Sequence, residues 1–299
     1  MPTITPLDAS FGARITDIDL ANLSDEDWSI VEDAFNEYGA LVFPGQNLSE
    51  EAQIAFGERF GPIEILRGDD RKAAAITNVN PDGTIMTPDK KRYMSLRGNE
   101  GWHTDSSYMP LAAKASCLAA QVTPESGGET ALADMRDAYD TLDQETRDQI
   151  QDLKAFHSLY ASQAKAGFEF KTGDGYGFHN KGAPLRPLVK THPDTGRKSL
   201  FIGRHAYRIP GMDDKDAQAL LDRLLDHACQ PPRVYAHQWK PGDVMIWDNR
   251  CILHRACPYD YAQARVMRHV RVAGDPATDL AETGRDERAD DFAPSAVNA

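Results

Sequence analysis

The stretch PGDVMIWDNRCILHRACPYD, residues 241–260, decides the fold. After a Pro-Gly pair it continues as an apolar run over 243–247, and Asp248 and Asn249 then separate that run from a second one. Short apolar runs between turn residues are typical of buried strands. Because an Asp-Asn pair favours a tight turn, a second strand would return His254 to the mouth of a barrel. The stretch therefore predicts two strands joined by a turn.

Similar runs recur along the chain. Each is short, apolar and bounded by Gly, Pro or Asp: ALVFPG (40–45), KASCLAAQVTP (114–124), KSLFIG (198–203), RVYAHQW (233–239) and ARVMRHVRVAG (264–274). Many strands with few helices between them argue against a doubly wound parallel sheet. They favour a mainly β fold, a double-stranded β-helix (jelly roll) core decorated by α-helices and long loops. We expect one such domain over residues 1–275.

Four helices are expected around this core. The first begins at Ser24, in a capping-box pattern with Asp27, and ends at Gly39. The second begins at Ser49 and ends at a Gly-Pro pair. Residues 134–153 and 213–229 form the other two, the latter with an apolar stripe at helical spacing.

Three polar segments are expected to lack regular structure. Residues 67–100 and 160–187 are predicted as long loop insertions, which inside a compact domain are usually functional. The acidic tail, residues 276–299, has little apolar content and is expected to be disordered.

Composition narrows the class of ligand. The 299 residues include 33 Lys and Arg against 46 Asp and Glu, a net charge of −13, which disfavours nucleic acid and anionic membranes and favours a small molecule. Four cysteines do not make a disulfide framework, and the N-terminal residues show no secretory pattern. No apolar run is long enough to span a membrane. We predict a cytoplasmic protein with reduced thiols, and a homo-oligomer is compatible with the sequence.

A metal site is suggested by GWHTDSSYMP, residues 101–110. In a strand, His103 and Asp105 would project to the same face. With His254 as third ligand they would form the two-histidine, one-carboxylate facial triad of non-haem Fe(II) oxygenases. Zinc is the rival, since the same ligands also make hydrolytic sites.

An arginine favours iron over zinc as the metal of this site. Strand alternation over 264–274 puts Arg265, Met267, His269 and Arg271 on one face and Arg268 on the other. An arginine facing an apolar barrel is costly unless an anion meets it, and a carboxylate would satisfy it through two hydrogen bonds. This requirement suggests an acidic co-substrate such as 2-oxoglutarate, with the hydroxyl of Thr130 donating to the same carboxylate.

Other polar and aromatic residues are weaker candidates. Cys251, His254 and Cys257 could suggest zinc, but offsets of three do not share one strand face, so both thiols are expected in the core or a loop. His205, in a loop after a predicted strand, is a candidate for substrate contact. Trp102 and Tyr108 flank the His103–Asp105 pair and are expected to shape the pocket.

Together the motifs resemble a known family. GWHTD, SGGET followed by a helix, THPDTGRKSLFIG, WKPGDVMIWDNRCILHRA and ARVMRH are similar to the Fe(II)/2-oxoglutarate dioxygenases of the taurine dioxygenase and 2,4-dichlorophenoxyacetate dioxygenase type. The resemblance extends to about residue 275. GRHAYRIPGMD, ACQPPRVYAHQW and DNRCILHRACPYD look closest to the aryloxyalkanoate dioxygenases that cleave (S)-phenoxypropionates. The resemblance implies Fe(II), 2-oxoglutarate and O2 as cofactor and co-substrates, with succinate and CO2 as products.

The resemblance also implies residue roles. It makes His103, Asp105 and His254 the iron ligands, Arg265 and Thr130 the anchors of 2-oxoglutarate, and Asn99 a substrate contact. His269 is a departure, because the taurine and dichlorophenoxyacetate enzymes carry a substrate-holding arginine there, and a histidine holds an anion only in a pH-dependent way. Arg271 would either supply the missing charge or form a structural ion pair.

We therefore predict a dioxygenase that cleaves the ether of a small anionic aryloxyalkanoate to a phenol and an oxoacid. The alternatives are a dioxygenase acting on an organosulfonate or alkylsulfate, a jelly-roll protein that binds a metal and an acid without turnover, and a zinc hydrolase that works without O2.

Overall fold

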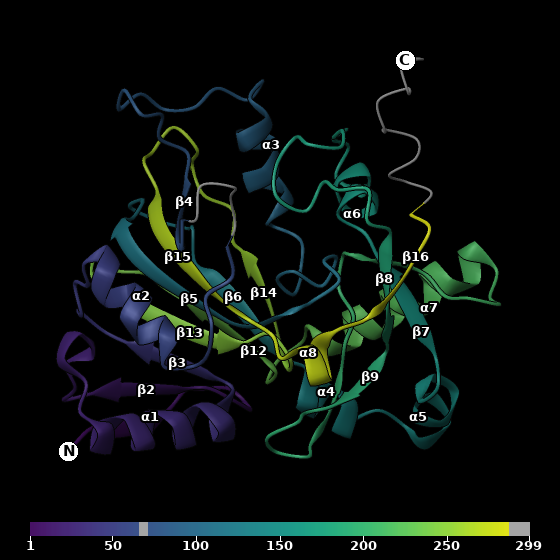
Figure 1. The fold of residues 1–299 in the computed structure, drawn as a ribbon, viewed down its shortest axis with the longest axis horizontal. Coiled ribbons are helices and arrows are strands. Elements are labelled where there is room, and N and C mark those ends of the chain that lie inside the picture. The colour runs from purple at the N-terminus through teal and green to yellow at the C-terminus, as the bar shows by residue number, and fades with distance from the viewer. Residues whose placement is uncertain (66–70, 287–299) are drawn as a thin grey trace.

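The computed structural model describes residues 1–65 and 71–286. Its largest sheet has seven strands, in the order β1 (Thr3–Pro6), β2 (Ala13–Thr16), β3 (Ala40–Phe43), β13 (Val244–Asp248), β5 (Ala113–Val122), β15 (Val266–Ala273) and β4 (Ala73–Thr77). All neighbours are antiparallel except β2 and β3. The predicted strands 40–45, 114–124 and 264–274 are confirmed as β3, β5 and β15; β5 and β15 are neighbours, and β13 lies between β3 and β5 (Figure 1).

Three smaller sheets complete the β structure. One contains β12 (Val234–His237), β6 (Thr130–Asp134) and β14 (Ile252–Ala256); another contains β11 (Ala206–Arg208), β7 (Lys154–His157), β8 (Ala183–Pro187) and β16 (Glu282–Gly284); the last pairs β9 (Val189–Thr191) with β10 (Lys198–Leu200). The predicted turn joins β13 to β14, but these strands belong to different sheets. The stretch 241–260 therefore connects the two sheets whose strands carry His254 and Arg271.

Apolar side chains fill the space between these two sheets. Leu118, Met245 and Trp247 from the seven-stranded sheet pack in one buried cluster with Leu132 and Ile252 from the three-stranded sheet. Burial of such side chains on both sheets is the main force that holds the sheets together. The chain is mainly β with helices, as predicted.

Two helices cover the outer face of the seven-stranded sheet. They are α1 (Asp25–Tyr38) and α2 (Glu50–Glu58), capped as predicted by the hydroxyls of Ser24 and Ser49. Apolar side chains of both helices, with those of the sheet, form a second buried cluster. A short 3-10 helix, η1 (Leu20–Asn22), precedes α1.

The helix predicted over 134–153 is wrong in its length. The structure has two short helices, α4 (Met135–Asp140) and α5 (Gln144–Ile150). Thr141 ends the first by donating its hydroxyl to the Asp137 carbonyl, and the Asp143 carboxylate caps the second. The helix predicted over 213–229 is α7 (Asp214–Ala228), whose apolar stripe packs against α4 in a third cluster.

The predicted loops and tail contain regular structure. Within 67–100 lie β4 and α3 (Lys91–Gly98). The segment 160–187 contains α6 (Leu159–Lys165) and β8 at its two ends, and residues 166–182 between them form neither helix nor strand, as expected for a loop. The tail forms α8 (Pro276–Asp279) and β16, which pairs with β8, so the expectation of disorder is wrong up to residue 286. Sequence patterns missed β4 and β16 because their partners, β15 and β8, are distant in the chain. Residues 287–299 lie outside the described residues.

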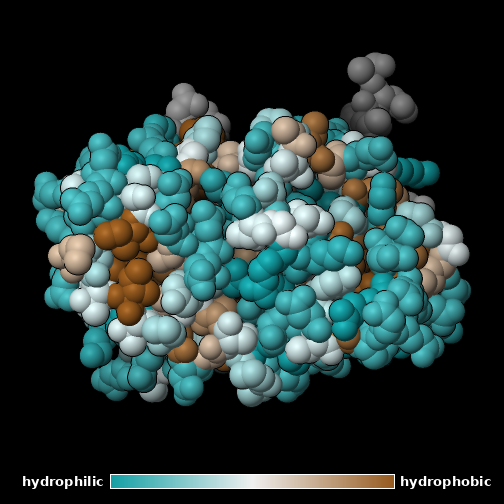
Figure 2. Space-filling model, turned by 90° about the horizontal axis from the view of Figure 1, so that it is seen from below, coloured by the Kyte–Doolittle hydropathy of each residue, from teal (hydrophilic) through white to brown (hydrophobic). Residues whose placement is uncertain are grey.

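The surface is polar over the face drawn in Figure 2, with small apolar areas. Within the described ranges no helix is long and apolar enough to cross a membrane.

Gly39 ends α1 in a left-handed conformation, with φ of 73°, and a Cβ here would lie 2.9 Å from a guanidinium nitrogen of Arg136. Arg136 is buried and donates to the Glu37 and Tyr38 carbonyls at the end of the helix. We expect Gly39→Ala to lower the free energy of unfolding by about 2 kcal/mol, since left-handed backbone alone costs an L-residue roughly 1–2 kcal/mol. Urea unfolding would measure it.

Gly45 provides the matched control. Its φ is 62°, but a Cβ there would meet nothing within 4 Å. Gly45→Ala therefore carries the backbone cost without the displacement of Arg136. Equal losses of stability in the two variants would contradict a role for the Arg136 contact.

Candidate active site

A cavity of about 1040 Å³ lies at one end of the two main sheets. Its walls come from β4, β15, β6 and β14, from α3 and α6, and from the loop between α6 and β8. Most predicted site residues reach this cavity: His103, Asp105, His254, Thr130, Arg265, Asn99, Tyr108, His205, His269 and Arg271.

His103, Asp105 and His254 meet in the cavity. One potential ligand atom from each lies within 4.8 Å of the other two, and all three side chains are buried. The backbones of His103 and His254 exchange two hydrogen bonds of 2.9 Å, which form an isolated antiparallel bridge. The strand predicted through Asp105 is wrong, because the chain turns there and Ser106 takes a φ of 53°. The turn, rather than strand alternation, brings the carboxylate beside the two imidazoles.

The imidazoles have the protonation state that metal binding needs. His103 Nδ1 lies 2.8 Å from the Gly101 carbonyl, so it donates its proton there and leaves the Nε2 lone pair for a ligand. Burial lowers the pKa of His103 to about 4 and holds the pKa of His254 well below its usual value. Both side chains are therefore neutral at pH 7, and with the carboxylate they fit a divalent metal.

Asp105 is held by neighbours on both of its oxygens. Ser116 donates its hydroxyl to Oδ2 at 2.6 Å, and Arg271 donates Nη2 to Oδ1 at 2.9 Å. Burial raises the pKa of Asp105, but Arg271 and the neighbouring histidines outweigh it and hold that pKa well below its usual range. The carboxylate is therefore ionised and fixed in orientation. Arg271 therefore forms a structural ion pair with Asp105, one of the two roles expected for it, and its Nε has no hydrogen-bond partner among the described residues.

The cavity also contains Arg265, an arginine whose guanidinium has unused hydrogen-bond donors. Arg265 is buried and donates Nε to the Gly128 carbonyl at 3.0 Å. Over residues 1–65 and 71–286 it has no ion pair, and burial lowers its pKa. Thr130 lines the same region, where its Oγ1 accepts a 3.0 Å hydrogen bond from the Trp239 indole. A carboxylate would find here two guanidinium nitrogens and a hydroxyl proton, the donors that bidentate recognition uses.

This combination agrees with comparisons to known proteins. Residues 3–273 match the family model described as taurine catabolism dioxygenase TauD, TfdA family.

The chain belongs to the TauD/TfdA family.

Three relatives are especially similar. The (S)-phenoxypropionate/alpha-ketoglutarate-dioxygenase of Sphingobium herbicidovorans is 51% identical over 93% of this chain and 97% of its own, and that of Delftia acidovorans is 48% identical over 92% and 96%. The crystal structure of AAD-2 in complex with Mn(II) and N-oxalylglycine has a TM-score of 0.86 and 37% identity, covering 95% of this chain and 100% of its own.

Trp102 is the one predicted site residue that does not line the cavity in this member of the TauD/TfdA family. Its ring packs against a buried apolar cluster and lies 4.7 Å from the Arg255 guanidinium carbon. The prediction that it shapes the pocket is therefore wrong. Because Trp102 directly precedes His103, the bridge to His254 turns its side chain away from the site.

Tyr108 and His205 form one wall. Their rings are nearly perpendicular with centroids 4.8 Å apart, and His205 Nδ1 lies 3.0 Å from the Ser107 hydroxyl. Burial raises the pKa of Tyr108 to about 12, so it remains a neutral phenol. His269 Nε2 lies 3.4 Å from Asp105 Oδ2 without an aligned hydrogen bond. Asn99, at the end of α3, faces the cavity beside them.

The sequence analysis missed several residues of the cavity. Tyr176 donates a short hydrogen bond to Glu64, whose carboxylate lies 3.7 Å from Arg271. Gln163, on α6, is buried, and its Oε1 has no hydrogen-bond partner among the described residues. Leu159 and Phe178 add apolar wall. Tyr176, Gln163 and Phe178 come from the segment 160–187, which was predicted as a loop, where no periodic pattern marks a face.

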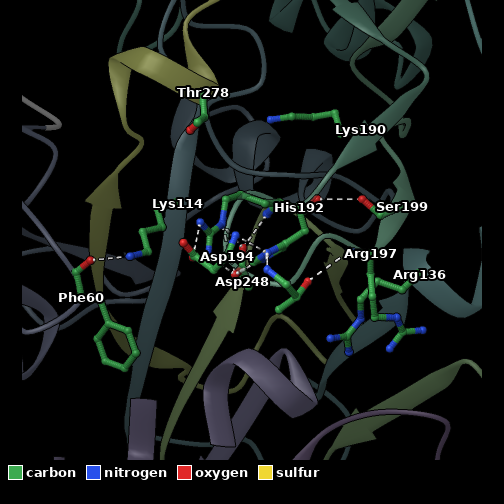
Figure 3. A network of polar contacts seen from close by, with 12 residues as sticks. Phe60, Lys114, Arg136, Lys190, His192, Asp194, Arg197, Ser199, Asp248 and Thr278 are labelled. Carbon is green, nitrogen blue, oxygen red and sulfur yellow. Dashed lines mark hydrogen bonds and ion pairs between the residues drawn. The ribbon is translucent and has the colours of Figure 1, made fainter. Parts of the chain in front are cut away.

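His192, Asp248 and Cys251 form a second group of potential ligands, but protein groups already satisfy it. Figure 3 shows His192 and Asp248 within a network of polar contacts. Asp248 accepts hydrogen bonds from His192 Nε2 at 2.9 Å and from Arg250 Nε and Nη2 at 2.9 and 2.6 Å. Burial raises the pKa of the Cys251 thiol. A metal would have to displace an arginine from a fully paired carboxylate, so we assign the group to the stability of the β13–β14 turn. Cys251 is a core residue, as predicted.

Proposed function

We propose that this protein is an Fe(II)- and 2-oxoglutarate-dependent dioxygenase that cleaves the ether of an aryloxyalkanoate. The observation that carries the proposal is the buried group His103, Asp105 and His254 in the same cavity as Arg265, a cation without an ion pair in the described part of the chain. The first feature suits a metal with open positions. The second suits a dicarboxylate beside it.

The protein residues divide the work of binding. His103, Asp105 and His254 would hold Fe(II) from one side, while Ser116 and Arg271 keep the Asp105 carboxylate in orientation. Arg265 and Thr130 would hold the far carboxylate of 2-oxoglutarate. Trp239 orients Thr130 by donating to its oxygen, which directs the hydroxyl proton elsewhere. When bound, Fe(II) with 2-oxoglutarate and O2 supplies the oxidation of one substrate C–H bond and yields succinate and CO2.

The cavity walls suit an aryl acid. Leu159, Phe178 and Tyr108 offer an apolar and aromatic surface for a ring. We propose that the substrate carboxylate lies near Arg271 and His205. Arg271 is buried, and its Nε has no hydrogen-bond partner among the described residues. Hydroxylation at the carbon that bears the ether oxygen gives a hemiketal or hemiacetal, which collapses to a phenol and an oxoacid.

We also propose the finer features of the fold and setting. The two main sheets would form the jelly roll, within a single domain over residues 1–275 that the C-terminal residues to 286 extend. All four cysteines are free, which suits the cytoplasm.

A substrate panel tests the proposed function. With Fe(II), 2-oxoglutarate and O2 present, we expect matched amounts of succinate and phenol from a phenoxypropionate or phenoxyacetate, and no product without O2. Both enantiomers of phenoxypropionate belong in the panel. Aldehyde with sulfite from a sulfonate, or with sulfate from an alkyl sulfate, in place of phenol, would favour the alternative substrate class. Product formed anaerobically would indicate hydrolysis, and ligand binding without succinate would reduce the protein to a binding module.

A further inference from the structure

Arg186, on β8, binds the turn that begins at Asp105. Its guanidinium donates to three main-chain carbonyls of this turn: Nε to Ser107 at 2.7 Å, and Nη2 to Met109 at 2.7 Å and Pro110 at 3.3 Å. The side chain is 2% exposed. It has no carboxylate partner within ion-pair distance among the described residues, and burial lowers its pKa to about 10.

The same guanidinium reaches the end of the chain. Its Nη1 donates to the Asp279 carbonyl at 3.0 Å. Residues 275–284, here called the C-terminal strap, leave β15, form α8 and pair as β16 with β8 (Figure 1). The strap lies beside the end of the turn, where Leu280 forms a bridge with Leu111. The Ala281 amide donates to Pro110, and the Ala112 amide donates to Asp279. The Asp279 carboxylate is buried and pairs with Lys190 at 2.8 Å.

We propose that Arg186 and the C-terminal strap are positioning elements of the metal site, which hold the 105–110 turn in the conformation that directs Asp105 toward His103 and His254. The proposal rests on the function proposed above. The turn needs such support because Ser106 has a φ of 53°, which is unfavourable for any residue with a side chain.

The chemistry of the side chain explains why an arginine occupies this position. Carbonyls of a tight turn point in different directions, and a planar fork with five donors meets several of them at once. A buried cation without a carboxylate is costly, so a purely structural contact would be met more cheaply by a neutral donor. The Asp279 carboxylate of the strap partly offsets the cost of burying this cation, because its negative charge lowers the positive potential at Arg186 and Lys190.

Arg186→Lys tests the proposal. We expect it to weaken Mn(II) binding to the metal-free protein by about tenfold or more, the range found for outer-shell partners of metal ligands. Mn(II) titration followed by electron paramagnetic resonance measures the affinity without turnover. Arg197→Lys is the matched control, because Arg197 pairs with Asp140 at the surface. Circular dichroism confirms that each variant is folded. Unchanged Mn(II) affinity in R186K would overturn the proposal.

A pair of truncations tests the strap itself. Removing residues 275–299 should weaken Mn(II) binding, while removing only 287–299 should not. Among residues 1–65 and 71–286, the four buried apolar clusters contain no residue beyond Val272, which favours folding of the shorter chain. Equal affinity of the two truncated proteins would overturn the role of the strap.

Hydrogen exchange on the wild-type protein tests the coupling between the strap and the turn without any variant. If the strap and the turn are coupled, Mn(II) should slow amide exchange in 275–281 together with 105–112, since coupling is reciprocal. Protection confined to 105–112 would contradict the coupling. Failure of the wild-type protein to bind Mn(II), or binding that persists in His254→Ala, would instead contradict the metal site on which the proposal rests.

Discussion

Replacing His254 by alanine is expected to remove succinate formation altogether. His254 provides one of three buried side chains that could hold the metal, and β14 fixes its position opposite His103 through two backbone hydrogen bonds. Loss of an outer-shell partner alone costs about 10- to 100-fold in metal affinity or activity, so loss of a ligand costs more. Succinate release with each substrate of the panel, against a protein-free control, measures the result.

The control for this variant is His227→Ala. His227 lies on α7, where its Nε2 contacts the Ala138 carbonyl, and it is not among the residues that line the cavity. The substitution removes a half-buried imidazole that does not line the cavity. Turnover by His254→Ala at the rate of His227→Ala would refute the His103, Asp105 and His254 site.

Replacing Arg265 by alanine is expected to raise the 2-oxoglutarate requirement by about 30- to 5000-fold, because losing one partner of a buried, hydrogen-bonded charge pair costs roughly 2–5 kcal/mol. Activity at saturating 2-oxoglutarate should fall much less, since the metal ligands remain. The dependence of the initial rate on 2-oxoglutarate concentration measures the change, and calorimetry on the Mn(II)-loaded protein measures it without turnover.

Two further variants sharpen this result. Arg265→Lys keeps the charge but loses the planar fork, so it should lie between the wild type and Arg265→Ala. Arg223→Ala, which removes an exposed charge from α7, should leave the requirement unchanged. A fall in maximal rate with an unchanged 2-oxoglutarate requirement would show that Arg265 does not anchor this co-substrate.

Much of the fold was predictable because its signals are local. Ser24 and Ser49 begin helices, Gly39 ends one, and short apolar runs mark most strands of the two main sheets. Each signal depends on residues a few positions apart. The strands β4 and β16 carry no such signal, because each forms on a partner strand that is distant in sequence.

The residues of the site were likewise predictable only where the signal in the sequence is local. Period-2 alternation over 264–274 placed Arg265, which directly precedes β15, and His269 and Arg271 on the face that lines the cavity. It placed Arg268 on the opposite side, where Arg268 donates to Gln53. The pairing of Arg271 with Asp105 and Glu64 does not follow from alternation, which gives the face but not the partner. Tyr176, Gln163 and Arg186 come from segments without a pattern.

The sequence by itself determined the chemistry of this protein: two histidines and an aspartate that suit a metal, an arginine that requires an anion, the strand that carries His254 and the strand that Arg265 directly precedes. The tertiary structure decided how these residues are held. It turns the chain at Asp105 and directs the Trp102 side chain away from the cavity. It also pairs Arg271 with the Asp105 carboxylate and places the C-terminal strap beside the 105–110 turn. The physical reason is that donor type and strand period are properties of neighbouring residues. The satisfaction of a buried charge or carbonyl depends on whichever distant segment packs against it.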